Sequence, residues 1–187
     1  KTPLSTIRLG LGALDHEKIV NDPEKRTKYL QVISTEAQHA YSLINRILTI
    51  SKSQAGKLEL KKVQVDMTSM LSKMEENFKV NRLKNVSFEN HINCQYAFAD
   101  EEYLKEIFYN LIDNSIKYSD GDVTIRISTD KVDKGVSIRV KDNGIGISKA
   151  DQKVIFDKYE RASAAKRTFK KKGAPGFGLG LTYVFQV

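Results

Sequence analysis

Residues 110–119 read Asn-Leu-Ile-Asp-Asn-Ser-Ile-Lys-Tyr-Ser. Apolar residues recur at helical spacing through this stretch and the residues before it, which predicts a helix that begins after Asp100, a good capping residue. On this helix Asn110 and Asn114 lie one turn apart on the same face. Their amide oxygens suit a hard cation, and Lys117 near that face suits a phosphate. Taken alone, two asparagines on an apolar helix are more often ordinary helix surface.

The segments around this helix alternate between apolar and polar residues, as strands with one buried face do. Turn signals at Asp120-Gly121 and Lys134-Gly135 bound two such segments, which predicts a β-hairpin. Together these patterns predict an α+β fold in which helices cover one face of a mixed sheet. The expected strands are residues 63–67, 86–90, 96–99, 123–127 and 136–140, with a further helix over residues 68–83.

A motif with two glycines comes directly after the last predicted strand. It reads Asp142-Asn-Gly144-Ile-Gly146-Ile. The glycines permit a tight turn, and Asp142 offers a carboxylate that can accept a hydrogen bond from an exocyclic amine. An ordinary Asx turn would look the same, so the motif alone is a weak signal.

A second glycine motif precedes the last predicted helix and reads Gly176-Phe-Gly178-Leu179-Gly180-Leu. Glycines at the start of a helix let backbone N–H groups meet an anion. The motif is neither a dinucleotide-binding fingerprint, because no strand precedes it, nor a P-loop, because no Gly-Lys-Ser/Thr follows. An aromatic and basic stretch that ends at Arg161 lies between the two glycine motifs.

Residues 1–57 show the pattern of two helices. Apolar residues repeat every three or four positions in residues 4–14 and again, as a heptad stripe, in residues 30–47. Asp22 before Pro23 is typical of a helix start, and Gly56 is typical of a helix end.

The apolar face of this hairpin is too wide for two helices to cover each other. We therefore expect two hairpins to pair in a four-helix bundle, which makes a homodimer through residues 1–55. The alternative is a hairpin packed on the C-terminal domain of its own chain.

The order and spacing of these motifs resemble those of sensor histidine kinases. The chain has the helix with Asn110 and Asn114, then the motif at Asp142, then an aromatic stretch ending in arginine, and then the motif at Gly176. Upstream, Lys1-Thr-Pro-Leu-Ser is similar to the end of that family's phosphoacceptor motif, His-Glu-Leu-Lys-Thr-Pro-Leu. The resemblance covers essentially the whole chain.

The resemblance implies a fold and a set of ligand contacts. Residues 1–57 would form the dimerisation and phosphotransfer hairpin, and residues 58–187 a two-layer α/β sandwich that binds ATP, as in gyrase-type and Hsp90-type ATPases. Asn110 and Asn114 would bind Mg²⁺, and Asp142 would accept a hydrogen bond from the adenine amino group. The other matched positions are Lys117 and Tyr118 beside the phosphates and the ribose or base, Gly144 and Gly146 in the hinge, Arg161 at the terminal phosphate, and Gly176, Gly178, Leu179 and Gly180 where a lid closes.

The resemblance also implies phosphoryl transfer from ATP to a histidine, for relay to an aspartate in the receiver domain of a response regulator. The histidine should lie three residues before Lys1, and the family's last helix continues beyond Val187. We therefore expect a chain truncated at both ends that does not phosphorylate itself. Thr2 matches the position that orients the attacking water when such kinases dephosphorylate their regulator. The expected location is cytoplasmic, as the cytoplasmic part of a membrane-anchored sensor.

The net charge of +8 first suggests nucleic acid or a lipid surface. Residues 1–60 contribute +3, residues 61–165 are neutral, and residues 166–187 contribute +5. Because most of the excess lies in one run inside the segment that resembles a lid, we interpret that run as support for a triphosphate or for an acidic partner surface, and otherwise as a solvated loop. We expect neither nucleic acid nor membrane contact. No run of about 18 apolar residues occurs, and the single Cys94 excludes an internal disulfide framework.

Two other functions stay open. One is an ATPase of the gyrase or Hsp90 type, which usually carries a catalytic Glu where Asn110 stands. The other is a non-enzymatic nucleic-acid-binding module that uses the lysines of residues 170–172, although the chain has no groove-reading motif.

Overall fold

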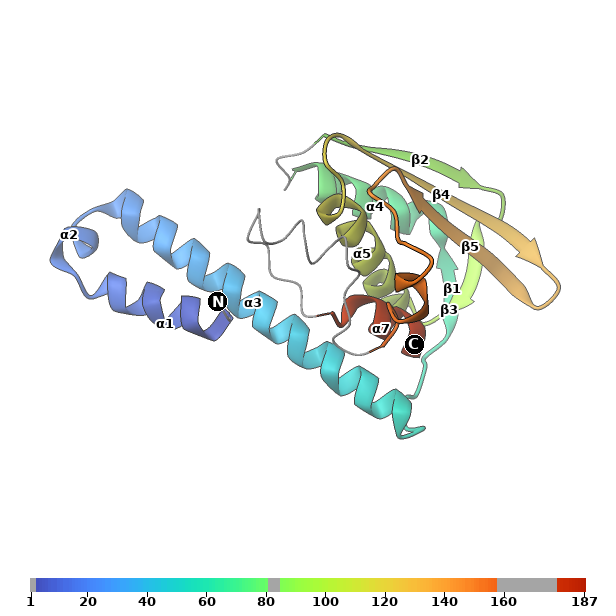
Figure 1. Ribbon diagram of the computed structural model, residues 1–187, viewed down its shortest axis with the longest axis horizontal. Helices are drawn as coiled ribbons and strands as arrows, with labels where there is room; N and C mark the ends of the chain where they lie inside the picture. Colours follow the sequence, from blue (N-terminus) through green and yellow to red (C-terminus); the bar gives the residue numbers. More distant parts are fainter. Residues whose placement is uncertain (1–2, 81–84, 158–177) are drawn as a thin grey trace. The chain divides into compact units, whose positions relative to one another are not determined.

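The computed structural model describes residues 3–80, 85–157 and 178–187 (Figure 1). The chain divides into two compact units, Lys1–Ala55 and Gly56–Val187, close to the domain boundary expected after residue 57. Among the described residues, no helix is both long enough and apolar enough to cross a membrane.

The N-terminal unit is a helical hairpin of α1 (Pro3–Leu14) and α3 (Pro23–Gln54), with a four-residue helix, α2 (Glu17–Val20), in the connection. The hairpin is confirmed, whereas α2 was not predicted. Asp22 caps α3 by accepting a hydrogen bond from Lys25 N at 3.1 Å.

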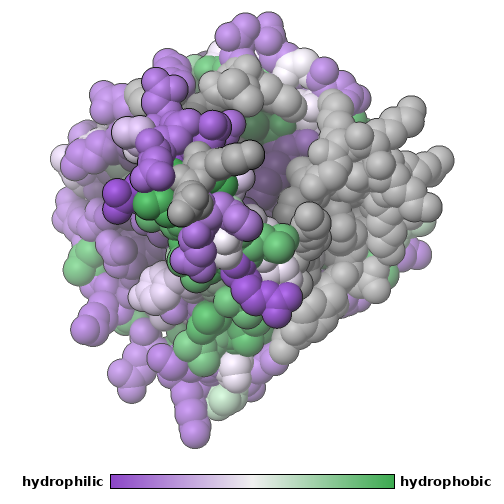
Figure 2. Space-filling view, turned by 90° about the vertical axis from the view of Figure 1, so that its left-hand side faces the viewer, coloured by the Kyte–Doolittle hydropathy of each residue, from purple (hydrophilic) through white to green (hydrophobic). Residues whose placement is uncertain are grey.

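Tight packing joins α1 and α3 at Gly10, because a Cβ there would lie 2.8 Å from Cγ1 of Ile33. Many large apolar side chains of the hairpin nevertheless stay exposed, among them Leu4 at 71% and Ile44 at 56%. Figure 2 shows hydrophobic residues exposed between hydrophilic ones on one face of the molecule. The hairpin therefore leaves unburied the wide apolar face that its sequence indicates.

The C-terminal unit is an α+β domain, as expected, with Asp100 as the N-cap of its central helix. Met67 begins a helix rather than ending a strand, and the strand expected over residues 86–90 extends to Ile92. The elements are β1 (Val63–Asp66), α4 (Met67–Val80), β2 (Val86–Ile92), β3 (Tyr96–Ala99), α5 (Glu101–Lys117), β4 (Val123–Val132), β5 (Gly135–Asp142), the 3₁₀ helix η1 (Asp151–Lys153) and α7 (Gly180–Gln186).

The larger sheet is mixed, as predicted, but two of the strands form a second sheet that was not predicted. Strand β4 pairs parallel with β2 and antiparallel with β5, while β1 pairs antiparallel with β3 in a separate two-stranded sheet. The chain turns away from the larger sheet after β2, at Cys94. The buried hydroxyl of Thr129 on β4 holds this turn, because it accepts from Cys94 N at 3.1 Å and donates to Cys94 O at 2.9 Å.

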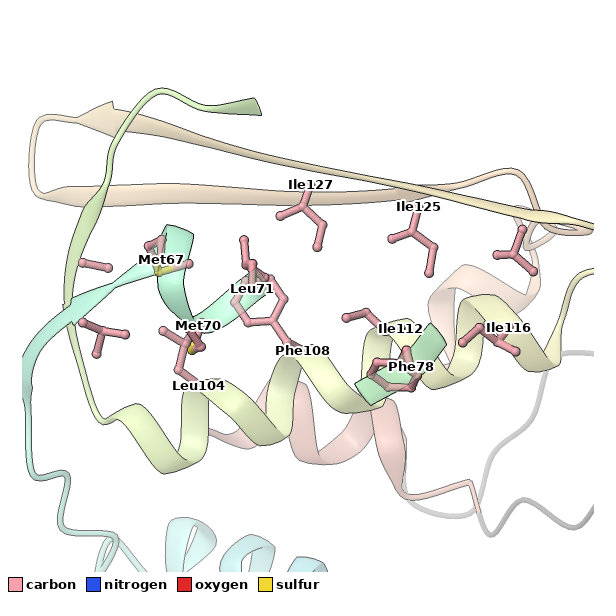
Figure 3. Packing of buried hydrophobic residues seen from close by; sticks show 13 residues of the cluster. Met67, Met70, Leu71, Phe78, Leu104, Phe108, Ile112, Ile116, Ile125 and Ile127 are labelled. Carbon is pink, nitrogen blue, oxygen red and sulfur yellow. The ribbon is translucent and has the colours of Figure 1, made fainter. Parts of the chain in front are cut away.

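Helices α4 and α5 cover one face of the larger sheet, which makes a two-layer α/β sandwich. Figure 3 shows Ile125 and Ile127 of β4 pointing toward Phe108 and Ile112 of α5. Burying each such side chain contributes roughly 1.5–3 kcal/mol. The buried members of this core are Val65, Met67, Met70, Leu71, Phe78, Ala97, Leu104, Phe108, Ile112, Ile116, Val123, Ile125 and Ile127.

Candidate functional site

Helix α5 is buried on a second side, and this side is polar. Asn110 is 3% exposed, although it does not belong to the apolar core. Its Nδ2 donates to the carbonyl of Glu106 one turn earlier, at 2.8 Å. The Oδ1 atom therefore points away from that carbonyl and remains as an acceptor at this side of the helix.

The start of α7 lies directly on these asparagines. A Cβ at Gly180 would stand 3.3 Å from Oδ1 of Asn110 and 3.7 Å from Nδ2 of Asn114. The buried side chains of Leu179 and Tyr183 anchor α7 in this place. A glycine at position 180 therefore lets the backbone of α7 approach the amide groups closely.

The carboxylate of Asp142 is held at both oxygens. Its Oδ1 accepts from Gly144 N at 2.8 Å, which is the Asx turn that the sequence allowed. The hydroxyl of Ser115 on α5 lies 3.2 Å from Oδ2 and 2.9 Å from the carbonyl of Leu111, so one hydrogen serves two acceptors. These contacts fix the orientation of Asp142 against α5. Ser115 was missed from the sequence.

The loop after β5 also contacts the end of α5 through backbone. Ile145 N donates to the carbonyl of Tyr118 at 3.0 Å. A Cβ at Gly144 would lie 2.8 Å from that carbonyl oxygen and 2.8 Å from Oδ1 of Asp142, so position 144 has no room for a side chain. Gly146 has φ of +69°, a conformation that favours glycine.

Asn143 connects this loop to the start of β4. Its Oδ1 accepts from Thr124 N at 2.9 Å, and its Nδ2 donates to the carbonyl of Asp122 at 3.2 Å. The side-chain amide thus acts as an additional peptide group beside the strand. This pairing, which the sequence did not indicate, fixes the loop at the edge where Asp142 lies.

Lys117 forms an ion pair with Asp113, one turn earlier on α5. A phosphate contact by Lys117 would therefore compete with Asp113 for its ammonium group.

Among residues 3–80, 85–157 and 178–187, no group of three or more His, Cys, Asp or Glu side chains could hold a metal ion. Oδ1 of Asn110 is an oxygen donor that the site offers a hard cation.

The structure brings most of the expected site together along α5. Asn110 and Asn114 meet the α7 start, and Tyr118 meets the loop that carries Asp142 and Gly144. Thr2, Arg161 and Gly176 lie outside the described residues, as do the lysines of residues 166–172.

Two protein-family models match the chain. The His Kinase A (phospho-acceptor) domain matches residues 1–56. The histidine kinase-, DNA gyrase B-, and HSP90-like ATPase matches residues 99–187, which contain α5, the Asp142 loop and α7. The chain belongs to the sensor histidine kinases. Its C-terminal unit is the ATPase-type domain of this family, and its hairpin is the phospho-acceptor domain.

Relatives of this histidine kinase chain match it over nearly its full length. Sensor protein RprX of Bacteroides fragilis is 30% identical over 192 residues, which cover 100% of the chain and 36% of RprX. The chain therefore spans about a third of that protein.

Solved structures share the fold. The match to Acinetobacter baumannii histidine kinase AdeS covers 99% of this chain and 82% of the AdeS chain, with a TM-score of 0.70 and 19% identity. Histidine kinase ThkA was solved in complex with response regulator protein TrrA. The match to this structure covers 89% of this chain and 50% of the other, with a TM-score of 0.56 and 20% identity. At these identities the likeness concerns the fold.

Proposed function

We propose that this chain is the kinase core of a sensor protein that binds Mg-ATP and transfers the γ-phosphoryl group to a histidine. The acceptor is the histidine that the family motif places three residues before Lys1 in the parent protein. The phosphoryl group then passes to an aspartate of a response regulator. ThkA, a structural neighbour, was solved with such a regulator, and this supports the same class of partner here.

The observation that carries the ATP site is the convergence of two separate segments on α5. Asp142 meets α5 at Ser115, and Gly180 meets it at Asn110, five residues or about 7.5 Å away along the helix axis. The first contact provides an acceptor for an exocyclic amine, and the second provides amide oxygens for a hard cation. These are the chemistries needed at the two ends of Mg-ATP.

The residues of this site fit the nucleotide and the ion. Asp142 would accept from the adenine amino group, in a loop whose hinge includes Gly144 and Gly146. Oδ1 of Asn110, together with Asn114, would hold Mg²⁺, which neutralises charge on the phosphates when bound. The remaining assignments are Lys117 and Tyr118 at the phosphates and ribose, backbone of Gly178, Leu179 and Gly180 at the phosphates, and, outside the described residues, Arg161 and Gly176 in the lid and Thr2 in dephosphorylation.

Two further parts of the proposal concern assembly and location. The exposed apolar side chains of the hairpin support a homodimer through residues 1–55, in which a second hairpin covers them. We place the kinase core in the cytoplasm, as part of a membrane-anchored sensor.

Nucleotide binding tests the site through Asp142→Ala. Titration calorimetry with ADP and Mg²⁺ should show affinity reduced by about 10-fold to 100-fold, because a hydrogen bond to a charged group contributes roughly 1.5–3 kcal/mol. Asp133→Ala, in the exposed β4–β5 turn, is the matched control and should bind as the unaltered chain does. Equal affinity of the two variants would contradict the assignment of Asp142.

Phosphoryl transfer tests the activity. The 187-residue chain should incorporate no acid-labile phosphate from labelled ATP, whereas the parent protein with the upstream histidine should incorporate it and pass it to a receiver domain. Acid-labile label on the short chain would contradict the proposed acceptor. Steady ATP turnover without phosphoprotein would favour an ATPase of the gyrase or Hsp90 type instead.

A further inference from the structure

The connection between the two units is attached to the C-terminal unit before β1 begins. Residues 57–62 have neither helical nor strand structure between α3 and β1. Within them, Lys61 N donates a hydrogen bond of 2.8 Å to Oδ2 of Asp100. Asp100 follows the last residue of β3 and is the N-cap of α5, so one side chain joins the connection to the helix of the candidate site.

The strand register explains this contact. In the antiparallel pair of β1 and β3, Val63 lies opposite Ala99, so the residues just before Val63 would next lie opposite residues after Ala99. The backbone after Ala99 turns into α5 instead, and the side chain of Asp100 supplies the acceptor. The contact therefore extends the pairing of β1 beyond the end of β3.

Both oxygens of this half-buried carboxylate are used. Oδ1 accepts from Glu102 N at 3.2 Å and Tyr103 N at 3.3 Å, which caps α5. Oδ2 accepts from Lys61 N. A helix cap requires the bonds of Oδ1 to the backbone of α5 but not the bond of Oδ2 to Lys61. The bond to Lys61 therefore does something other than cap the helix.

We propose that Asp100 is a positioning residue for phosphoryl transfer, because it fixes the point at which the connection enters the catalytic unit. This inference rests on the proposed function. With the bond to Lys61, the segment that links the units without regular structure is residues 56–60, beginning at Gly56 with φ of +64°. Without it, the free segment extends to the start of β1 at Val63, which makes seven residues instead of five.

The length of the free segment sets the effective concentration of the catalytic unit at the acceptor histidine. For a flexible linker this concentration falls roughly as the −3/2 power of length. Going from five to seven residues therefore lowers it by about 1.7-fold. This factor applies to a linker that is longer than the distance it has to span.

Hydrogen exchange measured by NMR on the full chain tests the contact. In the unaltered chain we expect the Lys61 amide to exchange about tenfold more slowly than the amides of Lys57 and Glu59, for which the described residues provide no acceptor. Asp100→Ala should abolish this difference. Asp66→Ala is the control, because Asp66 accepts from Ser69 N at 3.0 Å at the start of α4 and does not contact the connection. Equal exchange rates at the three amides of the unaltered chain would overturn the proposal.

Autophosphorylation of the parent protein at saturating ATP tests the consequence. Asp100→Ala should slow it by about 1.7-fold, and Asp66→Ala should not. Lys61→Pro removes the donor N–H and adds a ring, and it should slow the reaction equally, whereas Glu59→Pro adds the same ring and keeps the bond. Equal rates in Lys61→Pro and Glu59→Pro would refute the positioning role. If the unaltered parent forms no phosphohistidine, the proposed function fails, and the exchange experiment still decides whether the contact exists.

Discussion

Gly144→Ala is the substitution that most directly tests how the Asp142 loop is built. A methyl group at this position would stand 2.8 Å from Oδ1 of Asp142 and 2.8 Å from the carbonyl oxygen of Tyr118, well inside the 3.4 Å at which ordinary contact begins. One neighbour is a backbone atom of α5, which cannot move by itself. The carboxylate of Asp142 or the whole loop must therefore shift.

The expected cost follows from the bonds that the shift breaks. Moving the loop loses the bond from Gly144 N to Asp142 or the bond from Ile145 N to Tyr118, each about 1 kcal/mol. Overpacking of a rigid site adds roughly 1–3 kcal/mol. We expect the free energy of unfolding of the C-terminal unit to fall by about 2–4 kcal/mol, which lowers its Tm by roughly 7–14 °C. Nucleotide affinity should fall at least about tenfold, because Asp142 no longer has its fixed orientation.

Calorimetric melting and ADP titration measure these two effects, and two other glycines separate their causes. Gly121→Ala meets no atom within 4 Å and should leave both quantities unchanged. Gly146→Ala also has open space but a φ of +69°, so it should cost about 1 kcal/mol of strain without a steric clash. If Gly144→Ala melts within 1 °C of the unaltered chain and binds ADP equally well, the loop is not packed against α5 as described.

Two further predictions concern Ser115 and Asp66. Ser115→Ala removes the hydroxyl beside Oδ2 of Asp142 and should weaken ADP binding by about threefold to tenfold. The Tm should stay within about 2 °C, because alanine is the better helix former. An unchanged affinity would show that the hydroxyl does not orient the carboxylate. The carboxylate of Asp66 accepts a hydrogen bond from Ser69 N, and this bond lowers the pKa of Asp66 from its ordinary value. The stabilisation of α4 by this bond is therefore fully present above the unfolded pKa, about 3.9, and is lost as the pH falls through the folded pKa. An NMR titration should give Asp66 a midpoint below that of an exposed aspartate, and Asp66→Asn should reduce the acid sensitivity of the chain; a midpoint at the ordinary value would contradict the cap.

Local features of the fold could be predicted because neighbouring residues determine them. Asp100 is a residue type that favours the start of a helix, and α5 begins directly after it. The strand predicted over Tyr96–Ala99 has the same bounds in the structure. The division into two sheets could not be predicted in this way. At the turn between the sheets, the hydroxyl of Thr129 binds the backbone of Cys94, a residue 35 positions earlier, and such a distant pairing leaves no local signal.

The candidate site shows the same difference. The sequence indicated Asn110 and Asp142 through their motifs, but each motif was ambiguous when read alone. What the structure adds is contact between motifs: Gly180 on Asn110, and Ser115 against Asp142. Ser115 gave no signal of its own, because a serine beside Asn114 on a helix looks like any other small polar residue, and its partner lies 27 positions away.

The pairing of Asn143 with the start of β4 also bears on how this protein ages. Asn-Gly dipeptides are the sequences most prone to deamidation, because the glycine N–H can attack the unhindered asparagine side chain to form a succinimide. Here Gly144 N is engaged by Oδ1 of Asp142, and both ends of the Asn143 amide are bound to the backbone beside β4. These bonds restrain both groups in the folded protein, so unfolded molecules should react faster. Each conversion to aspartate would place a new negative charge next to Asp142, so preparations that have repeatedly unfolded in storage would accumulate a chemically damaged hinge.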